Sequence, residues 1–296
     1  MTSAAVTVPF EGPQQADFTF IPRGQKARVL GVEYVPLRLS DGGELYLTAY
    51  GWPWRQNLLP QAWFAHERYL RQGVKLPRST GHVYRLPTVA DGRRLDIVIK
   101  VSRMAQHVPI LVLHDHGMAG RDPRAAEFCT PFDEVAWLER LRNSRQGPAA
   151  LRIRTKRALA IYSPPTRYQE WQLGRAASQM GRLARRLSED QQDNGFGCTL
   201  ELHPHRDYLL LYAWIKGENA EELFDAGVLT GQDLEAIAHQ AAQDLQAKGF
   251  CVLDHKPNHV ILRRRPDGRL LARQGRLVYA LADFELLIPA SAEGTG

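Results

Sequence analysis

A polar loop between a long amphipathic helix and a pair of strands is the feature that most constrains the fold of this chain. The helix begins at Thr230, a favourable N-cap with Asp233 three residues later, and it ends before Gly249. The loop and first strand read LDHKPNHVIL, and a second strand is predicted at 276–281 after a Pro-Asp-Gly turn. This part of the chain is therefore predicted to contain both a helix and strands.

The rest of the sequence predicts further strands and helices. Alternating residues and turn signals predict a hairpin at 27–50 and two further strands joined by Asp91-Gly92. Helices are predicted at 58–71, at 130–142 with Thr130 as N-cap, and at 168–189. The remaining strands are predicted at 82–86, 95–102, 150–162 and 207–215.

Two charged residues stand in mostly apolar segments. Lys100 ends the strand LDIVIK, and a lysine at the end of a buried strand needs an anionic partner. Glu134 shares a helical face with Leu138 and Leu141, so its carboxylate needs a cation. Lys100 is a candidate for that cation.

These motifs together resemble protein kinases. Lys100 matches the phosphate-binding lysine of the Val-Ala-Ile-Lys strand, and Glu134 matches the glutamate of the helix that follows it. Asp254-His255-Lys256-Pro257 resembles the catalytic loop Asp-Leu-Lys-Pro, and Asp283-Phe284-Glu285 resembles the metal motif Asp-Phe-Gly. The resemblance covers roughly residues 74–288, with the motifs in the family's order. A histidine at position 259 makes the lipopolysaccharide (heptose and Kdo) kinases of bacteria the nearest comparison.

The resemblance implies an α+β fold of two lobes, with an antiparallel sheet in the first lobe and a truncated, mainly helical second lobe. Three segments are expected. Residues 1–72 would be an added hairpin and helix, 73–216 a kinase-like first lobe with a helical insertion, and 217–296 the shortened second lobe with the catalytic and metal loops.

The resemblance also implies roles for individual residues, with ATP and Mg²⁺ as cofactors. Lys100 would grip the α- and β-phosphates with Glu134 orienting it, and main-chain groups of Tyr212, Ala213 and Ile215 would meet the adenine. Asp254 would accept the acceptor's proton and Lys256 would neutralise the γ-phosphate. The metal ligands implied are Asp283 with Asn258 or His259.

The chain departs from the family pattern in ways that bear on activity. Val252-Leu253 replaces the His-Arg pair before the catalytic aspartate, and Glu285 replaces the glycine of the metal motif. His259 occupies the position of the metal-binding asparagine. Few residues follow Asp283, which favours a small molecule, sugar or lipid headgroup over a protein as the hydroxyl acceptor. A nucleotide-binding pseudokinase or regulatory protein stays open as the alternative.

Two other function classes stay open with less support. The pairs His114-Asp115-His116 and His203-Pro204-His205 could ligate a hydrolytic metal, whereas Pro257 between His255 and His259 argues against a helical zinc motif. Two basic patches could contact nucleic acid, although no nucleic-acid motif accompanies them: Arg152, Arg154, Lys156 and Arg157, and the run Arg263–Arg265.

The charge and composition of the chain bear on its partner and its location. The chain has 296 residues and a formal net charge of +6, which suits an anionic partner without choosing one. Its three cysteines show no disulfide or zinc spacing, and no signal peptide or membrane-spanning run is evident, so we expect a cytoplasmic location.

Overall fold

The computed structural model describes residues 17–77, 81–107, 127–148, 151–192, 194–273 and 275–290. The chain divides into two compact units. The first unit takes in 1–106, 130–136 and 157–214, and the second takes in 107–129, 137–156 and 215–296. Residues 17–72, predicted as an added hairpin and helix, lie in the same unit as Lys100.

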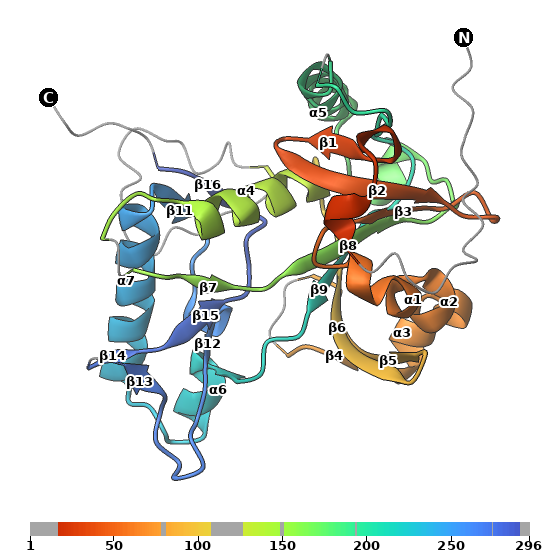
Figure 1. The fold of residues 1–296 in the computed structure, drawn as a ribbon. Coiled ribbons are helices and arrows are strands. Elements are labelled where there is room, and N and C mark those ends of the chain that lie inside the picture. Colours follow the sequence, from red (N-terminus) through yellow and green to blue (C-terminus); the bar gives the residue numbers. More distant parts are fainter. Residues whose placement is uncertain are drawn as a thin grey trace, which may run out of the picture. The chain divides into compact units, whose positions relative to one another are not determined.

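An eight-stranded antiparallel sheet forms the centre of the first unit (Figure 1). Its strand order is β1-β2-β3-β8-β9-β6-β5-β4, so the predicted hairpin at 27–50 is part of the sheet that carries Lys100. The structure therefore confirms an α+β fold with a large antiparallel sheet. The strands are β1 (Ala27–Val29), β2 (Val32–Arg38), β3 (Glu44–Leu47), β4 (Val74–Lys75), β5 (Val83–Ala90), β6 (Arg93–Val101), β8 (Ala158–Ser163) and β9 (Leu209–Ala213).

The alternation of side chains gives the sheet two different faces. Residues such as Leu45, Ile97 and Leu211 lie in one buried apolar cluster together with Leu58 and Trp63 from outside the sheet. The segment that carries Leu58 and Trp63 lies against β5 (Figure 1). Residues one position along the strands point to the opposite face, because side chains alternate with period two. The opposite face carries Tyr34, Tyr46, Lys100, Tyr208 and Tyr212.

The prediction of a single helix at 58–71 is wrong. The segment forms α1 (Arg55–Leu58), α2 (Pro60–Trp63) and α3 (Arg68–Gln72). Pro60 begins the second piece, and His66 and Glu67 have φ of 54°, in the left-handed region. These breaks turn the chain so that Trp63 is fully buried, with its indole N–H donating to the Leu58 carbonyl at 2.9 Å.

Helix α4 (Pro131–Asn143) confirms the helix predicted at 130–142. Thr130 and Asp133 form a capping box, since each accepts from the main-chain N–H of the other. Phe132 packs edge-on against Tyr34 and Tyr46, which places the start of α4 on the tyrosine-bearing face of the sheet. Helix α5 (Ala177–Asp190) begins later than predicted, after a left-handed Gly174, and its Arg186 pairs with Asp133.

The strand predicted at 150–162 is two strands in two sheets. β7 (Arg154–Thr155) pairs with β15 of the second unit, while β8 pairs with β3 and β9. Sequence pattern alone gave no break here, because the residues on both sides of Lys156 and Arg157 suit a strand.

The second unit contains strands as well as helices, and a mainly helical second lobe is not confirmed. The unit contains α6 (Ala220–Asp225), α7 (Gly231–Ala247) and the part of α4 that follows Ala136, and α7 begins with the predicted capping box at Thr230 and Asp233. A four-stranded sheet has the order β10-β12-β15-β7, and two short pairs join β11 to β16 and β13 to β14. The strands are β10 (Glu218–Asn219), β11 (Phe250–Val252), β12 (Val260–Leu262), β13 (Ala272–Arg273), β14 (Arg276–Leu277), β15 (Tyr279–Leu281) and β16 (Leu287–Pro289).

None of the helices in the described residues is both long and apolar enough to cross a membrane.

Candidate functional site

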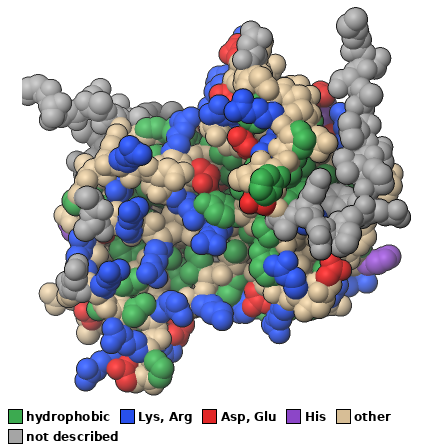
Figure 2. All heavy atoms as spheres, viewed as in Figure 1, with side chains coloured by type: hydrophobic (Ala, Val, Ile, Leu, Met, Phe, Trp, Pro, Cys, Tyr) green, Lys and Arg blue, Asp and Glu red, His purple; other side chains and the backbone are tan. Residues whose placement is uncertain are grey.

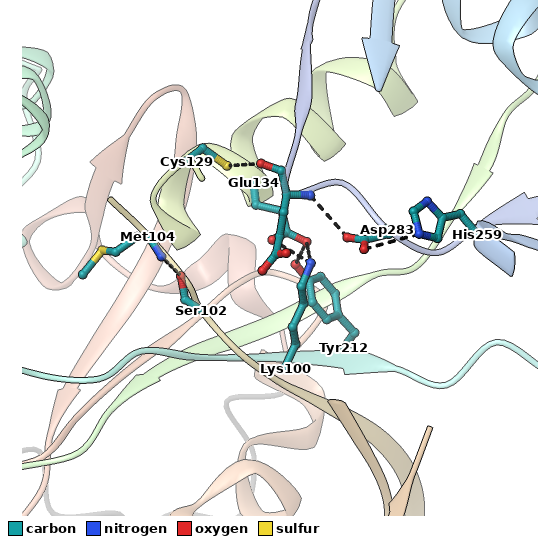
Figure 3. Close-up of polar contacts among 9 residues, drawn as sticks. Lys100, Ser102, Met104, Cys129, Glu134, Tyr212, His259 and Asp283 are labelled. Atoms are coloured by element: carbon teal, nitrogen blue, oxygen red, sulfur yellow. Dashed lines mark hydrogen bonds and ion pairs between the residues drawn. The ribbon is translucent and has the colours of Figure 1, made fainter. Parts of the chain in front are cut away.

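A buried ion pair joins Lys100 to Glu134 in the first unit. Lys100 lies near the end of β6, and its Nζ is 3.3 Å from Glu134 Oε1 and 3.4 Å from Oε2 (Figure 3). Lys100 is 5% exposed and Glu134 is 2% exposed. Removing two charges from water costs several kcal/mol per ion unless partners and hydrogen bonds offset it. A pair this deep in the fold is therefore a candidate for function.

Glu134 reaches Lys100 because the first turn of α4 is fixed on the sheet. The capping box at Thr130 sets where the helix begins, and Phe132 is held among the tyrosine rings. The Tyr212 hydroxyl donates to Glu134 Oε1 at 2.7 Å, within normal hydrogen-bond range (Figure 3). The carboxylate thus receives the ammonium group and the phenol together.

The main chain expected to meet adenine is largely committed to the sheet. Tyr212 lies on β9 between β6 and β8, and the Ala213 N–H donates to the Arg157 carbonyl at 3.0 Å. The Trp214 N–H donates to the Asp96 carbonyl at 3.0 Å. Ile215 lies beyond the last of these hydrogen bonds and outside any strand.

Two loops of the second unit face each other between strand pairs. The first, 253–259, connects β11 to β12, and the second, 282–286, connects β15 to β16. β11 pairs with β16 and β12 pairs with β15, so both ends of each loop are held. Two main-chain hydrogen bonds join the loops themselves, from Leu253 N–H to the Leu286 carbonyl at 3.1 Å and from Ala282 N–H to the His259 carbonyl at 2.9 Å.

The joined loops bring His259 next to Asp283. His259 Nε2 lies 3.7 Å from Asp283 Oδ2, and the Glu285 N–H lies 3.4 Å from Asp283 Oδ1 (Figure 3). The Asp283 side chain is 26% exposed, so its carboxylate reaches solvent while its loop is fixed.

The predicted catalytic pair lies in the first of these loops. Lys256 Nζ is 3.6 Å from Asp254 Oδ2, with both side chains partly exposed. His255 Nε2 lies 3.2 Å from the Ala238 carbonyl of α7, which anchors the loop on that helix. Asn258 lies in the 3-10 turn Pro257–His259, directly before β12.

The donor types of the second unit fit a magnesium ion in part. Asp283 and Asn258 offer the oxygen ligands that Mg²⁺ prefers, whereas an imidazole nitrogen from His259 suits Mn²⁺, Zn²⁺ or Fe²⁺ better than Mg²⁺. Among the described residues no group of three or more His, Cys, Asp or Glu side chains is arranged to hold a metal. Mg²⁺ is commonly bound by one or two carboxylates and the substrate's own phosphates, so a sparse protein ligand set is compatible with it.

The histidine pairs considered for a hydrolytic metal gain no support. His114, Asp115 and His116 lie outside the described residues. His203 Nε2 is 2.9 Å from Glu44 Oε2, which also accepts from the Tyr46 hydroxyl at 2.6 Å. Burial raises the pKa of Glu44, but these hydrogen bonds outweigh it and hold the pKa below its ordinary value.

Basic side chains gather on the turn between β12 and β13. Figure 2 shows Lys and Arg side chains on this projecting part at the lower end of the view. Arg264 makes two contacts with Glu218, at 2.7 Å and 2.5 Å, and Arg265 donates to the Ala272 carbonyl at 3.3 Å. Arg264 and Arg265 of the predicted basic run therefore stabilise the basic hairpin that this turn forms.

Sequence reasoning missed the side-chain role of Tyr212 and the surroundings of Phe284. From the sequence, only the main chain of Tyr212 is expected to act, by contacting adenine. Strand alternation from Tyr208 and Leu210 nevertheless places the Tyr212 ring on the face of Lys100. Near the second loop, Cys129 Sγ donates to the Glu285 carbonyl at 3.2 Å and Lys156 Nζ lies 5.9 Å from the Phe284 ring centroid. No local sequence signal links these residues across such distances in the chain.

Comparison with known proteins gives a limited result. No family model matches the sequence, and no curated protein matches it. Among solved structures, WaaP in complex with acyl carrier protein aligns with a TM-score of 0.33 and 10% identity, over 79% of this chain and 71% of that one. Rv3197 of Mycobacterium tuberculosis, solved with erythromycin, aligns with a TM-score of 0.27 and 14% identity, over 79% of this chain and 51% of that one. TM-scores of this size do not establish a common fold.

Proposed function

We propose that the protein transfers a phosphoryl group from ATP to a hydroxyl of a small molecule, sugar or lipid headgroup. The observation that carries the proposal is the buried pair of Lys100 and Glu134. Apolar residues of similar size often stabilise a fold as well as a buried ion pair does, so the presence of this pair points to a use of its charge.

Lys100 is proposed to bind the α- and β-phosphates. Phosphoryl transfer is catalysed mainly by positioning and by neutralisation of charge, and an ammonium group in a buried, low-dielectric setting serves both. Glu134 orients Lys100 before the nucleotide arrives. The adenine is proposed to meet main-chain groups at Ile215, which lies beyond the hydrogen bonds that commit Ala213 and Trp214.

The residues of the two joined loops are proposed to carry the chemistry of transfer. Asp254 takes the proton of the acceptor hydroxyl while the oxygen of that hydroxyl bonds to the γ-phosphorus. The bond from the γ-phosphorus to the β–γ bridging oxygen breaks, and this oxygen leaves with ADP. Lys256 neutralises the transferred group. Asp283, with Asn258 or His259, would hold Mg²⁺, which supplies further neutralisation of the phosphates.

One observation favours a second function, nucleotide binding without transfer. His259 stands beside Asp283 where an oxygen ligand is expected, and an imidazole is a poor ligand for Mg²⁺. A protein that binds ATP through Lys100 alone would act as a pseudokinase or regulatory protein.

Calorimetric titration of ATP with and without Mg²⁺ tests the proposal. The proteins to compare are the wild type, Lys100→Ala, Asp283→Ala and a control, Arg264→Ala, in the hairpin away from the named residues. Mg²⁺-dependent binding that both site variants lose and the control keeps supports the kinase site. Binding that ignores Mg²⁺ and Asp283 supports the pseudokinase. Absence of ATP binding refutes both, and a steep salt dependence of RNA or DNA binding would then favour the basic hairpin as a nucleic-acid contact.

A further inference from the structure

Tyr212 and Lys100 approach Glu134 from neighbouring strands of one sheet. In the register of β6 and β9, Lys100 lies opposite Leu210, so Tyr212 is its diagonal neighbour two residues along β9. Diagonal neighbours share a face and lie within reach of long side chains. Both therefore converge on the single carboxylate that α4 presents to that face.

Tyr212 and Lys100 differ in how closely they approach the Glu134 carboxylate. The phenol oxygen of Tyr212 is 2.7 Å from Glu134 Oε1, whereas Lys100 Nζ lies at 3.3 Å and 3.4 Å from the two oxygens. A hydrogen bond to an ionised acceptor is stronger and more directional than one between neutral groups. Tyr212 is fully buried, so water does not compete for this bond.

We propose that Tyr212 is a positioning residue whose hydroxyl holds the Glu134 carboxylate in the orientation that receives Lys100. The inference rests on the proposed function for its consequence, which is that the phosphate-binding lysine is already in place before ATP binds. The first turn of α4 is fixed as well, by its capping box and by Arg186 on Asp133. Assembly of the pair then needs no movement of α4.

The direct test is a crystal structure of Tyr212→Phe without ligand. The variant removes one oxygen and leaves the ring, and we expect the Glu134 carboxylate to rotate and the Lys100–Glu134 distances to exceed the 4.0 Å of an ion pair. Tyr162→Phe is the matched control, because Tyr162 is a fully buried tyrosine of the same sheet for which no hydroxyl hydrogen bond is found among the described residues. A pair that keeps wild-type geometry in Tyr212→Phe overturns the inference.

Nucleotide affinity supplies the functional arm. If the fraction of molecules with Lys100 in place falls to about a tenth, the dissociation constant for ATP rises about tenfold, since affinity scales with the competent fraction. The same substitution in a Lys100→Met background should have no further effect on ATP, and Tyr162→Phe should bind as wild type. A general loss of folding would instead weaken binding in both backgrounds.

The outcomes separate the inference from the proposed function. If Lys100→Met binds ATP as tightly as wild type, the proposed phosphate site is wrong, and the ligand-free structure still decides whether Tyr212 positions the pair. If Lys100→Met loses ATP but Tyr212→Phe binds normally with an intact pair, the site stands and the inference fails. Should Tyr212→Phe not fold, Tyr212→Met removes the same hydroxyl with a flexible side chain and takes its place in both arms.

Discussion

The main-chain N–H of Ala282 donates a hydrogen bond to the carbonyl of His259, with an N···O distance of 2.9 Å. This bond continues the ladder between β12 and β15 past the ends of both strands. It fixes the backbone on each side of the His259–Asp283 contact. The imidazole and the carboxylate are therefore neighbours because of the fold, and they are two of the side chains proposed to hold the metal.

Exchange of His259 for asparagine tests the choice of metal. His259→Asn replaces an imidazole nitrogen by an amide oxygen, the donor that Mg²⁺ prefers, so we expect ATP to bind more tightly with Mg²⁺ and the preference for Mn²⁺ over Mg²⁺ to fall. Calorimetry of ATP with each metal measures the ratio. His255→Asn is the control, since His255 contacts the Ala238 carbonyl instead of Asp283. An unchanged ratio in His259→Asn would show that residue 259 does not ligate the metal.

Removal of one partner of the buried pair should destabilise the fold. Glu134→Ala leaves Lys100 with an uncompensated buried charge, for which we expect a loss of about 3–5 kcal/mol in the free energy of unfolding. Urea denaturation measures it. Glu67→Ala is the control, because Glu67 and Arg71 are 3.9 Å apart and 68% exposed, and pairs of that kind contribute little. A loss for Glu134→Ala no larger than the control's would contradict the burial argument.

The Glu44 cluster predicts a particular dependence of stability on pH. The folded-state pKa of Glu44 lies below its ordinary 4.5, so its ionised form adds stability above that pH and the contribution is lost as pH falls through the lowered pKa. Glu44→Gln should therefore be less stable than wild type at pH 7, with a difference that shrinks as the pH falls below about 4.5. Urea denaturation of both proteins across this range checks it, and a difference that stays constant with pH would argue against the pKa shift.

Local signals predicted much of the fold because they depend on neighbours in the chain. The capping boxes at Thr130 and Thr230 gave the starts of α4 and α7, and the turn at 41–43 gave the hairpin of β2 and β3. The break after Thr155 was missed because it is set by partners far away, with β7 next to β15 and β8 next to β9. Strand propensity says that a segment extends but does not say which sheet it joins.

The candidate site shows the same division. The apolar surroundings of Lys100 and Glu134 predicted that each would need a partner of opposite charge. The structure shows that the two form an ion pair with each other. The hydrogen-bond partner of the Tyr212 hydroxyl could not be predicted from the sequence, because it depends on the angle at which α4 crosses the sheet. His259 and Asp283 were singled out by resemblance, and only the strand pairing shows that they are neighbours.

Two glycines should respond to alanine in opposite directions. A Cβ at Gly51 would lie 1.9 Å from the Leu159 carbonyl oxygen, where β8 accepts the Thr48 N–H at 3.0 Å, so the turn or the strand must shift. We expect Gly51→Ala to cost about 3 kcal/mol or more, at the upper end of overpacking effects. Gly181 lies inside α5, and its added Cβ would meet nothing within 4 Å, so Gly181→Ala should stabilise the protein by about 1 kcal/mol through helix propensity. Thermal and urea unfolding measure both variants. A neutral Gly51→Ala would mean that the contact with β8 is looser than the carbonyl position indicates, and a destabilised Gly181→Ala would mean that this face of α5 is covered.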